Sequence, residues 1–144
     1  MRSIDTNILL YAINSDCPEH KASLKFIGHA LEEPLSWIIA DQVWFELYRL
    51  LRNQVVLSRP LSAAEAVDTI QWYRYRSGWL SCAWEPNMMD TLLPYWKNAS
   101  LSPRNSFDLV LAVTLASHGV ETLYTRNTRD FEDLELIHIE NPVD

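Results

Sequence analysis

Two acidic residues, Asp5 and Asp108, stand where their chemistry could matter most. Asp5 follows Ile4 and precedes Thr6 and Asn7, whose short polar side chains could hold the carboxylate or a water molecule. Asp108 directly precedes a long apolar run, so it is predicted to open a buried helix. Each could simply cap a helix. A carboxylate leading a buried helix is nevertheless costly unless cations or several donors compensate it, and a divalent metal ion would supply that compensation.

Glu46 is a weaker candidate taken alone. It borders the apolar face of a helix predicted over 41–53. A glutamate at the edge of such a face usually extends to solvent or forms an ion pair, and Arg49 lies three positions further on. Glu46 therefore gains weight only if the fold brings it to other acids.

The fourth candidate lies in the segment 125–131. Asp130 could reach into a site while Phe131 anchors the loop in the core. A solvated turn is the simpler interpretation, and Asn127 is an equally good polar contributor from the same loop. The identity of the fourth site residue stays open between Asp130 and Asn127.

The combination of these acids is more informative than any one of them. Several carboxylates at one end of a sheet would repel each other unless metal ions bind. Oxygen ligands without clustered His or Cys favour Mg²⁺ or Mn²⁺. One or two such ions can activate a water molecule and stabilise the charge that develops during phosphodiester cleavage. A phosphodiester or another phosphate is the predicted substrate.

The elements that must position these acids alternate between short apolar strands and longer amphipathic helices. Strands are predicted at 3–5, 35–40, 80–84, 122–125 and 134–139. Helices are predicted at 6–12, 19–31, 41–53, 62–76, 87–98 and 108–117. Strands separated by helices indicate an α/β fold with a parallel sheet covered on both faces. The ligand site of such a sheet lies beyond the carboxyl ends of its strands.

Several residues mark the predicted helix ends. Asp41 is placed to cap the helix over 41–53, and Ser62-Ala-Ala-Glu65 is a capping box. Gly78 and Gly119 are expected to end two helices, and Pro94 to distort or split another.

The charge balance excludes binding of nucleic acid through bulk positive charge. Lys and Arg number 12 against 19 Asp and Glu, which gives a net charge of −7. Arginines are nevertheless concentrated over 49–76, where they could guide an RNA backbone or form ordinary surface ion pairs. The candidates for RNA contact are Arg49, Arg52 and Arg126.

Aromatic residues are numerous, with six Trp and six Tyr. Unpaired bases stack well on such rings, although core packing is the commoner use. Trp37 and Trp44 are predicted to lie in the core, and the candidates for an interface or groove are Trp72, Tyr73, Tyr75, Trp79 and Trp96.

The compartment is predicted from the cysteines and from the start of the chain. Cys17 and Cys82 are too few for a disulfide framework, and no Cys/His metal-ligand spacing is present. The apolar run over 8–13 is too short for a membrane span and lacks the features of a signal peptide. We therefore expect a cytoplasmic protein without a membrane partner.

Four segments together resemble the PIN-domain family, and within it the VapC-type ribonuclease toxins of bacterial toxin–antitoxin pairs. They are Asp5-Thr-Asn-Ile-Leu-Leu-Tyr-Ala, Glu46 in the helix after the second strand, Ser106-Phe-Asp108-Leu-Val-Leu-Ala-Val and Thr125-Arg-Asn-Thr-Arg-Asp130-Phe. The resemblance runs from residue 3 to about 139. It implies one PIN domain over 1–144, a three-layer α/β/α sandwich with a mainly parallel sheet of four to five strands.

The resemblance also implies a function. It is that of a Mg²⁺- or Mn²⁺-dependent endoribonuclease toxin, usually a homodimer, which a cognate antitoxin keeps inactive. Asp5 and Asp108 would be the principal metal ligands, and Glu46 and Asp130 would complete the acidic cluster directly or through water. Thr6 or Asn7 would support them. Many relatives carry an acid at the place of Asn127, so the sequence departs from the family pattern there.

Two other functions are compatible with parts of the pattern. A PIN-like module that binds RNA or a protein without cutting would keep the fold but need not bind metal at its carboxylates. A small phosphatase on a doubly wound sheet is disfavoured, because an aspartyl-phosphate enzyme normally carries a second Asp two residues after the first. This sequence has Asn7 at that position.

Overall fold

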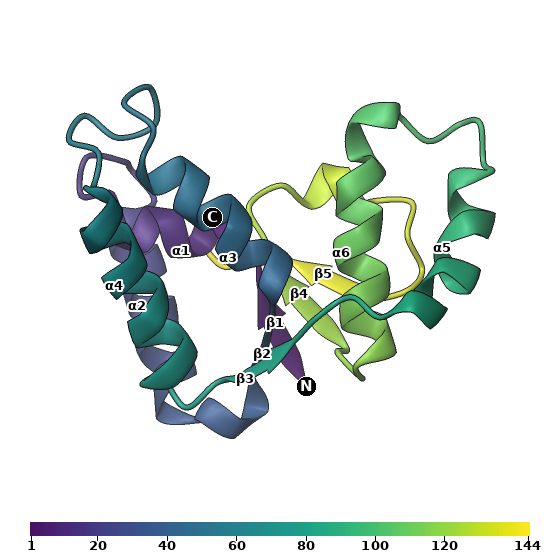
Figure 1. Ribbon diagram of the computed structural model, residues 1–144, viewed down its shortest axis with the longest axis horizontal. Coiled ribbons are helices and arrows are strands. Elements are labelled where there is room, and N and C mark those ends of the chain that lie inside the picture. Colours follow the sequence, from purple (N-terminus) through teal and green to yellow (C-terminus); the bar gives the residue numbers. More distant parts are fainter.

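The central layer consists of parallel strands that separate two groups of helices (Figure 1). The computed structural model describes residues 1–144. One sheet has the order β1-β4-β5, and a bridge between Arg2 and Trp37 joins it to the pair β2-β3. The strands are β1 (Arg2–Ile4), β2 (Ile38–Ala40), β3 (Leu80–Cys82), β4 (Thr122–Tyr124) and β5 (His138–Glu140).

The helices cover both sides of this layer. Four of them lie on one side in Figure 1, namely α1 (Thr6–Ile13), α2 (His20–Glu32), α3 (Asp41–Leu51) and α4 (Ala63–Tyr75). On the other side are α5 (Met89–Trp96) and α6 (Ser106–Ser117). The short 3₁₀ turns are η1 (Pro34–Ser36), η2 (Pro86–Met88), η3 (Pro103–Asn105) and η4 (Thr128–Phe131). The three-layer α/β/α architecture with a parallel sheet is confirmed. No helix is long and apolar enough to cross a membrane.

Most of the predicted helix boundaries are confirmed. Ser62 and Glu65 form the reciprocal capping box at the start of α4. Gly78 and Gly119 both have positive φ angles, which allow the chain to turn after α4 and α6. Pro94 lies inside α5 without splitting it.

Three predictions about the strands and the start of α3 are wrong. The strand predicted over 35–40 begins only at Ile38, because the chain after Pro34 forms the 3₁₀ turn η1. The strand predicted over 134–139 lies later in the chain, as β5. Asp41 does not cap α3: Ala40 is the N-cap, and Asp41 forms an ion pair with Arg74 instead.

The strands end at one edge of the sheet, and this fixes where polar side chains meet. Ile4 pairs with Tyr124, and Tyr124 with Glu140, so β1, β4 and β5 end in register. The Asp5 N–H donates to the carbonyl of Tyr124 at 2.9 Å, and the Thr125 N–H donates to that of Glu140 at 2.9 Å. The residues that follow β1 and β4 therefore lie side by side.

Candidate active site

Asp5 lies at the junction between β1 and α1 and is held by hydrogen bonds. Its backbone is extended, and as the N-cap of α1 its Oδ1 accepts the N–H of Thr6 at 2.8 Å. Its Oδ2 accepts the hydroxyl of Thr125 at 2.7 Å. Only 9% of the residue is exposed. Asp5 thus serves as a helix cap and is also fixed from the neighbouring strand.

The surroundings of Asp5 disfavour its negative charge. Burial raises the pKa of Asp5 from 3.8 to about 6, although the hydrogen bonds from Thr125 and Thr6 act in the opposite direction. The charges of Glu46 and Asp130 raise it further. No Lys, Arg or His forms an ion pair with Asp5. The carboxylate is therefore buried beside other acids without a compensating cation.

Asp108 faces the same group of acids from the other side of the sheet. It is the third residue of α6, whose N-cap is Asn105, so it neither opens nor caps that helix. Burial raises the pKa of Asp108 to about 7, and the charges of Asp130, Asp5 and Glu46 add to the effect. The charge of Arg104 partly offsets these contributions. Like Asp5, Asp108 takes part in no ion pair.

Glu46 and Asp130 complete this acidic cluster from α3 and η4. Glu46 is exposed, and its Oε2 accepts the hydroxyl of Thr6 at 3.2 Å. The alternative pairing of Glu46 with Arg49 is absent. Asp130 lies beside Phe131, which is only 1% exposed and anchors the loop as predicted. The fold brings all four candidate acids close enough to interact. The charges of Asp5, Glu46 and Asp130 all raise the pKa of Asp108, and those of Glu46 and Asp130 raise that of Asp5.

A network of polar side chains ties the loop after β4 to Asp5. The amide of Asn7 donates to Thr125 Oγ1 at 3.1 Å, and its Oδ1 accepts the backbone N–H of Arg126 at 3.1 Å. Thr125 Oγ1 also accepts the N–H of Asn127 at 3.1 Å. The side chain of Asn127 is exposed, so this residue joins the network through its backbone. The loop is thereby held in a fixed register relative to Asp5.

Thr125 is the residue of this network that sequence reasoning missed. It is fully buried and donates the shortest of the hydrogen bonds to Asp5. Its position contains the signal that could have found it, because Thr125 follows β4 as Asp5 follows β1. Parallel strands that end in register place the two next residues together.

The basic residues singled out from the sequence are arranged differently from one another. Arg49 and Arg52 are exposed on α3, and Arg52 donates to the Tyr48 hydroxyl at 3.0 Å. The Nε atom of Arg126 lies 4.0 Å from Glu19 and 3.7 Å from Asp144. Of the three, only Arg126 joins the polar network around Asp5, because its backbone N–H donates to Asn7 Oδ1. Its part in RNA binding, like that of Arg49 and Arg52, stays a prediction.

The aromatic residues divide between core and surface. Trp37 and Trp44 are buried as predicted, at 2% and 5% exposure. Trp79 was expected at an interface but is buried, and its indole N–H donates to the carbonyl of Ala30 at 3.1 Å. Tyr73 is likewise stacked between Trp44 and Trp79. The expected surface aromatics that are in fact exposed are Trp72, Tyr75 and Trp96.

The donor set of the cluster suits a hard cation. The four acids and the nearby hydroxyls offer only oxygen atoms, which Mg²⁺ and Mn²⁺ prefer. No three Asp, Glu, His or Cys side chains are spaced to hold one ion by themselves. An ion bound here would take one or two carboxylates directly and fill its remaining positions with water or substrate oxygens, which is the usual pattern for Mg²⁺.

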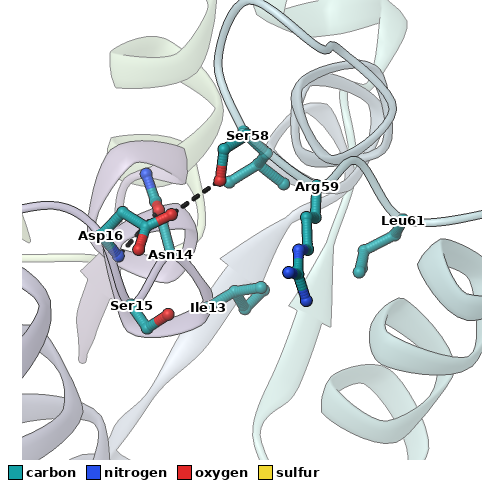
Figure 2. Close-up of a pocket in the computed structure, with 8 residues that line it drawn as sticks. Ile13, Asn14, Ser15, Asp16, Ser58, Arg59 and Leu61 are labelled. Carbon is teal, nitrogen blue, oxygen red and sulfur yellow. Dashed lines mark hydrogen bonds between the residues drawn. The ribbon is translucent and has the colours of Figure 1, made fainter.

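A separate polar hollow of about 350 Å³ lies at the other end of α1 (Figure 2). It is lined in part by Asn14, Asp16 and Arg59, and Asp16 accepts a hydrogen bond from Ser58 at 2.7 Å. The eight residues of α1 place it about 12 Å along the helix from Asp5. This hollow holds one carboxylate and one guanidinium, so it does not share the uncompensated charge of the acidic cluster.

A parallel sheet with acids near the carboxyl ends of its strands is the arrangement that the resemblance to PIN domains implies. Comparison with known families leads to the same family. Residues 3–136 match the PIN domain, so the chain belongs to the PIN-domain family.

The similar proteins are named as ribonucleases and toxins. The chain is 38% identical over 146 residues to Ribonuclease VapC24 of Mycobacterium tuberculosis (strain CDC 1551 / Oshkosh), covering 99% of this chain and 97% of that protein. M. tuberculosis VapC20, described as a Sarcin-Ricin loop cleaving toxin, has a similar fold with a TM-score of 0.69, 12% identity and coverage of 92% and 94% of the two chains. A toxin–antitoxin complex from Klebsiella pneumoniae contains a chain with a TM-score of 0.60, 22% identity and coverage of 99% and 98%.

Proposed function

We propose that this chain is a divalent-metal-dependent endoribonuclease that acts as the toxin of a toxin–antitoxin pair. The observation that carries the proposal is the placement of Asp5 and Asp108, two carboxylates whose charged forms are disfavoured by burial and neighbouring acids and that form no ion pair. Perturbed carboxylates of this kind are concentrated at functional sites. The full-length likeness to Ribonuclease VapC24 supports RNA as the substrate class.

Mg²⁺ is the proposed cofactor, and Mn²⁺ is expected to replace it. Asp5 and Asp108 would hold the ion, with Glu46 and Asp130 contributing directly or through water. When bound, such an ion activates a water molecule and stabilises the charge that develops on the cleaved phosphodiester.

The protein's own residues fix the geometry of this site. Thr6 and Thr125 each hold one oxygen of Asp5, so that carboxylate cannot rotate freely. Asn7 holds Thr125 and the backbone of Arg126 in turn. We assign Asn127 a supporting part through its backbone and favour Asp130 as the fourth acid, because its charge raises the pKa of both Asp5 and Asp108.

Two protein partners are proposed beside the RNA. The fold is shared with a chain of a toxin–antitoxin complex, and this supports a cognate antitoxin. A second copy of the chain is supported by the exposed rings of Phe45 and Phe107, at 73% and 75% exposure, which line one apolar hollow of about 410 Å³. Paired aromatic residues at such exposure are typical of subunit interfaces. We also propose that residues 1–144 act as one PIN domain in the cytoplasm.

RNA cleavage tests the catalytic part of the proposal. The purified chain, freed of any antitoxin, should cleave RNA in Mg²⁺ or Mn²⁺ and lose this activity in excess EDTA. Asp5→Ala and Asp108→Ala should lose cleavage on the order of 10³-fold, equal to about 4 kcal/mol of transition-state stabilisation. Asp68→Ala, an exposed acid on α4, is the matched control and should cleave normally. Cleavage that survives both site substitutions, or persists in EDTA, overturns the proposal.

Expression in cells tests the toxin part. Growth should stop when the wild-type chain is expressed and should recover with Asp5→Ala or on co-expression of the antitoxin. The alternative, a PIN-like module that binds RNA or a protein without cutting, predicts no cleavage and no Mn²⁺ binding that depends on Asp5.

A further inference from the structure

A second hollow adjoins the acidic cluster and has the opposite character. It has a volume of about 390 Å³ and is lined by Arg126, Asn127, Thr128, Arg129 and Asp130, with no hydrophobic residue. Its lining residues carry two guanidinium groups and one carboxylate. The lining is therefore more basic than the acidic cluster beside it, and Arg129 is the arginine without a carboxylate partner.

The guanidinium of Arg129 is available to a ligand. Arg129 is exposed, forms no ion pair and donates no side-chain hydrogen bond within the protein. Arg126 is held only loosely, since its Nε lies 3.7 Å from Asp144 and 4.0 Å from Glu19. That buried Nε has no hydrogen-bond partner. No hydrogen bond inside the protein therefore fixes the side chain of Arg126, although two carboxylates lie within 4.0 Å of its Nε.

The position of the hollow relative to Asp5 is fixed by the fold. The backbone of Arg126 is bonded to Asn7, and that of Asn127 to Thr125, which itself donates to Asp5. Asp130 belongs both to the hollow and to the acidic cluster. A group bound in the hollow would therefore be held at a set distance from the acids.

We propose that this hollow binds a backbone phosphate of the RNA, next in the chain to the phosphate that is cleaved, through Arg126 and Arg129. The inference rests on the proposed ribonuclease function and adds a binding subsite to it. Guanidinium groups bind phosphates with paired hydrogen bonds, and the Thr128 hydroxyl offers a further donor. An acidic cluster in a chain of net charge −7 repels an RNA backbone. Arginines next to the cluster would offset this repulsion.

Binding without catalysis gives the first test. Affinity for a short single-stranded RNA is measured by fluorescence anisotropy in EDTA over a range of salt concentrations. The non-cleaving Asp5→Asn protein serves as the background. Adding Arg129→Ala should weaken binding about tenfold at low salt and reduce the slope of log affinity against log salt by about one, as expected for one lost phosphate contact. Arg129→Lys should give an intermediate loss, because the charge remains without the paired donors.

The control is Lys25→Ala, which removes one positive charge from an exposed position on α2. It should leave affinity within about twofold of the background, since the contact is local and long-range charge effects are screened. Unchanged thermal unfolding of the Arg129→Ala protein would show that its fold is intact.

Neutral linkages locate the contact on the RNA. Methylphosphonates are placed one at a time on both sides of a cleavage position mapped with the wild-type chain. One flanking linkage should slow wild-type cleavage about tenfold, as loss of a charge-assisted contact predicts. The same linkage should slow Arg129→Ala by less than about twofold, because the contact is already missing.

The outcomes separate this inference from the proposed function. Absence of cleavage by the wild-type chain overturns the ribonuclease proposal, whereas the binding test in EDTA still judges the hollow. If Arg129→Ala binds RNA with the affinity and salt slope of the background, the phosphate site is wrong. The same holds if Arg129→Ala loses only its neutralisation by the antitoxin, since the hollow would then serve a protein.

Discussion

Asp5 and Asp41 occupy equivalent places in the fold but have opposite surroundings. Each directly follows a parallel strand and stands at the start of the next helix. Asp41 forms an ion pair with Arg74, and about a third of each side chain is exposed. Asp5 is buried, faces Glu46 and Asp130, and has only hydroxyl, amide and backbone N–H donors around it. Position at the carboxyl end of a strand therefore identifies both acids as candidates, and the missing cation distinguishes the one with unbalanced charge.

The two acids also differ in what they contribute to the free energy of folding. A partly exposed pair such as Asp41–Arg74 contributes about 0–1 kcal/mol, because water screens the attraction. Asp5 destabilises the folded state at any pH at which it is ionised, because burial and neighbouring negative charges disfavour its own negative charge. A folded protein that keeps such an acid has to gain something else from it, and the divalent cation proposed above would supply that gain.

Metal affinity should show the largest difference between the two acids. Asp5→Asn is expected to weaken Mn²⁺ binding at least about 100-fold, because loss of even an outer-shell partner weakens metal binding about 10- to 100-fold. Asp41→Asn should bind Mn²⁺ as the wild type does. The measurement is the rise in thermal unfolding temperature on Mn²⁺ titration, which reports binding to the folded state. Equal shifts in the two variants would remove the basis of the comparison.

The choice between Asp130 and Asn127 as the fourth site residue can be tested in the same way, by comparing two variants. Asp130 raises the pKa of Asp5 and Asp108, whereas the exposed side chain of Asn127 bonds to neither. Asp130→Asn should therefore reduce RNA cleavage about 10- to 100-fold, the range typical of groups that support a metal site. Asn127→Ala should reduce it less than about threefold if only its backbone supports the site. Reversed effects would assign the fourth position to Asn127.

The sequence was informative about these acids because their places depend on periodicity and chain order. Asp5 directly follows a strand, and parallel strands bring such positions together by topology. What could not be predicted depends on contacts between distant segments. Asp41 reads as an N-cap until Arg74, on another helix, is placed beside it. From the sequence, Tyr73 and Trp79 likewise look like surface aromatics. In the structure Tyr73 stacks between Trp44 and Trp79, and these contacts join segments that are distant in the sequence.

Element boundaries show the same division. The capping box at Ser62 and the turn at Gly78 are encoded by adjacent residues, and both are present. The strand predicted over 134–139 begins too early, because an apolar run does not show which of its residues pairs with a neighbouring strand. That choice is made by the register of β5 against β4.

The free energy of unfolding should change with pH in the opposite direction to that expected for an ordinary carboxylate in an ion pair. The pKa of Asp5 is raised to about 6 and that of Asp108 to about 7, so the folded protein binds more protons than the unfolded chain between about pH 4 and 7. Without metal, the free energy of unfolding should therefore fall as pH rises through this range. A shift of about two pKa units for Asp5 corresponds to about 3 kcal/mol.

Asp5→Asn tests this assignment in EDTA. Asn keeps the acceptor oxygen for the Thr6 N–H but cannot ionise, so the variant should be about 1–2 kcal/mol more stable than the wild type at pH 8. The gain should disappear near pH 4, where Asp5 is protonated in the folded wild type. Urea unfolding at the two pH values measures both differences. A variant that is less stable at pH 8 would mean that hydrogen bonding at Asp5 outweighs its buried charge.

Asp41→Asn should give the smallest effect and the opposite sign. Removing the charge leaves Arg74 without its partner, so the protein should lose up to about 1 kcal/mol of stability at pH 8. A double-mutant cycle with Arg74→Gln isolates the pair and should give a coupling of about 0.2–1 kcal/mol that shrinks in high salt. If the coupling were several kcal/mol, or if Asp41→Asn were stabilising, then the presence of a compensating cation would not be what distinguishes Asp41 from Asp5. The functional assignment of Asp5 would then have to rest on its burial alone.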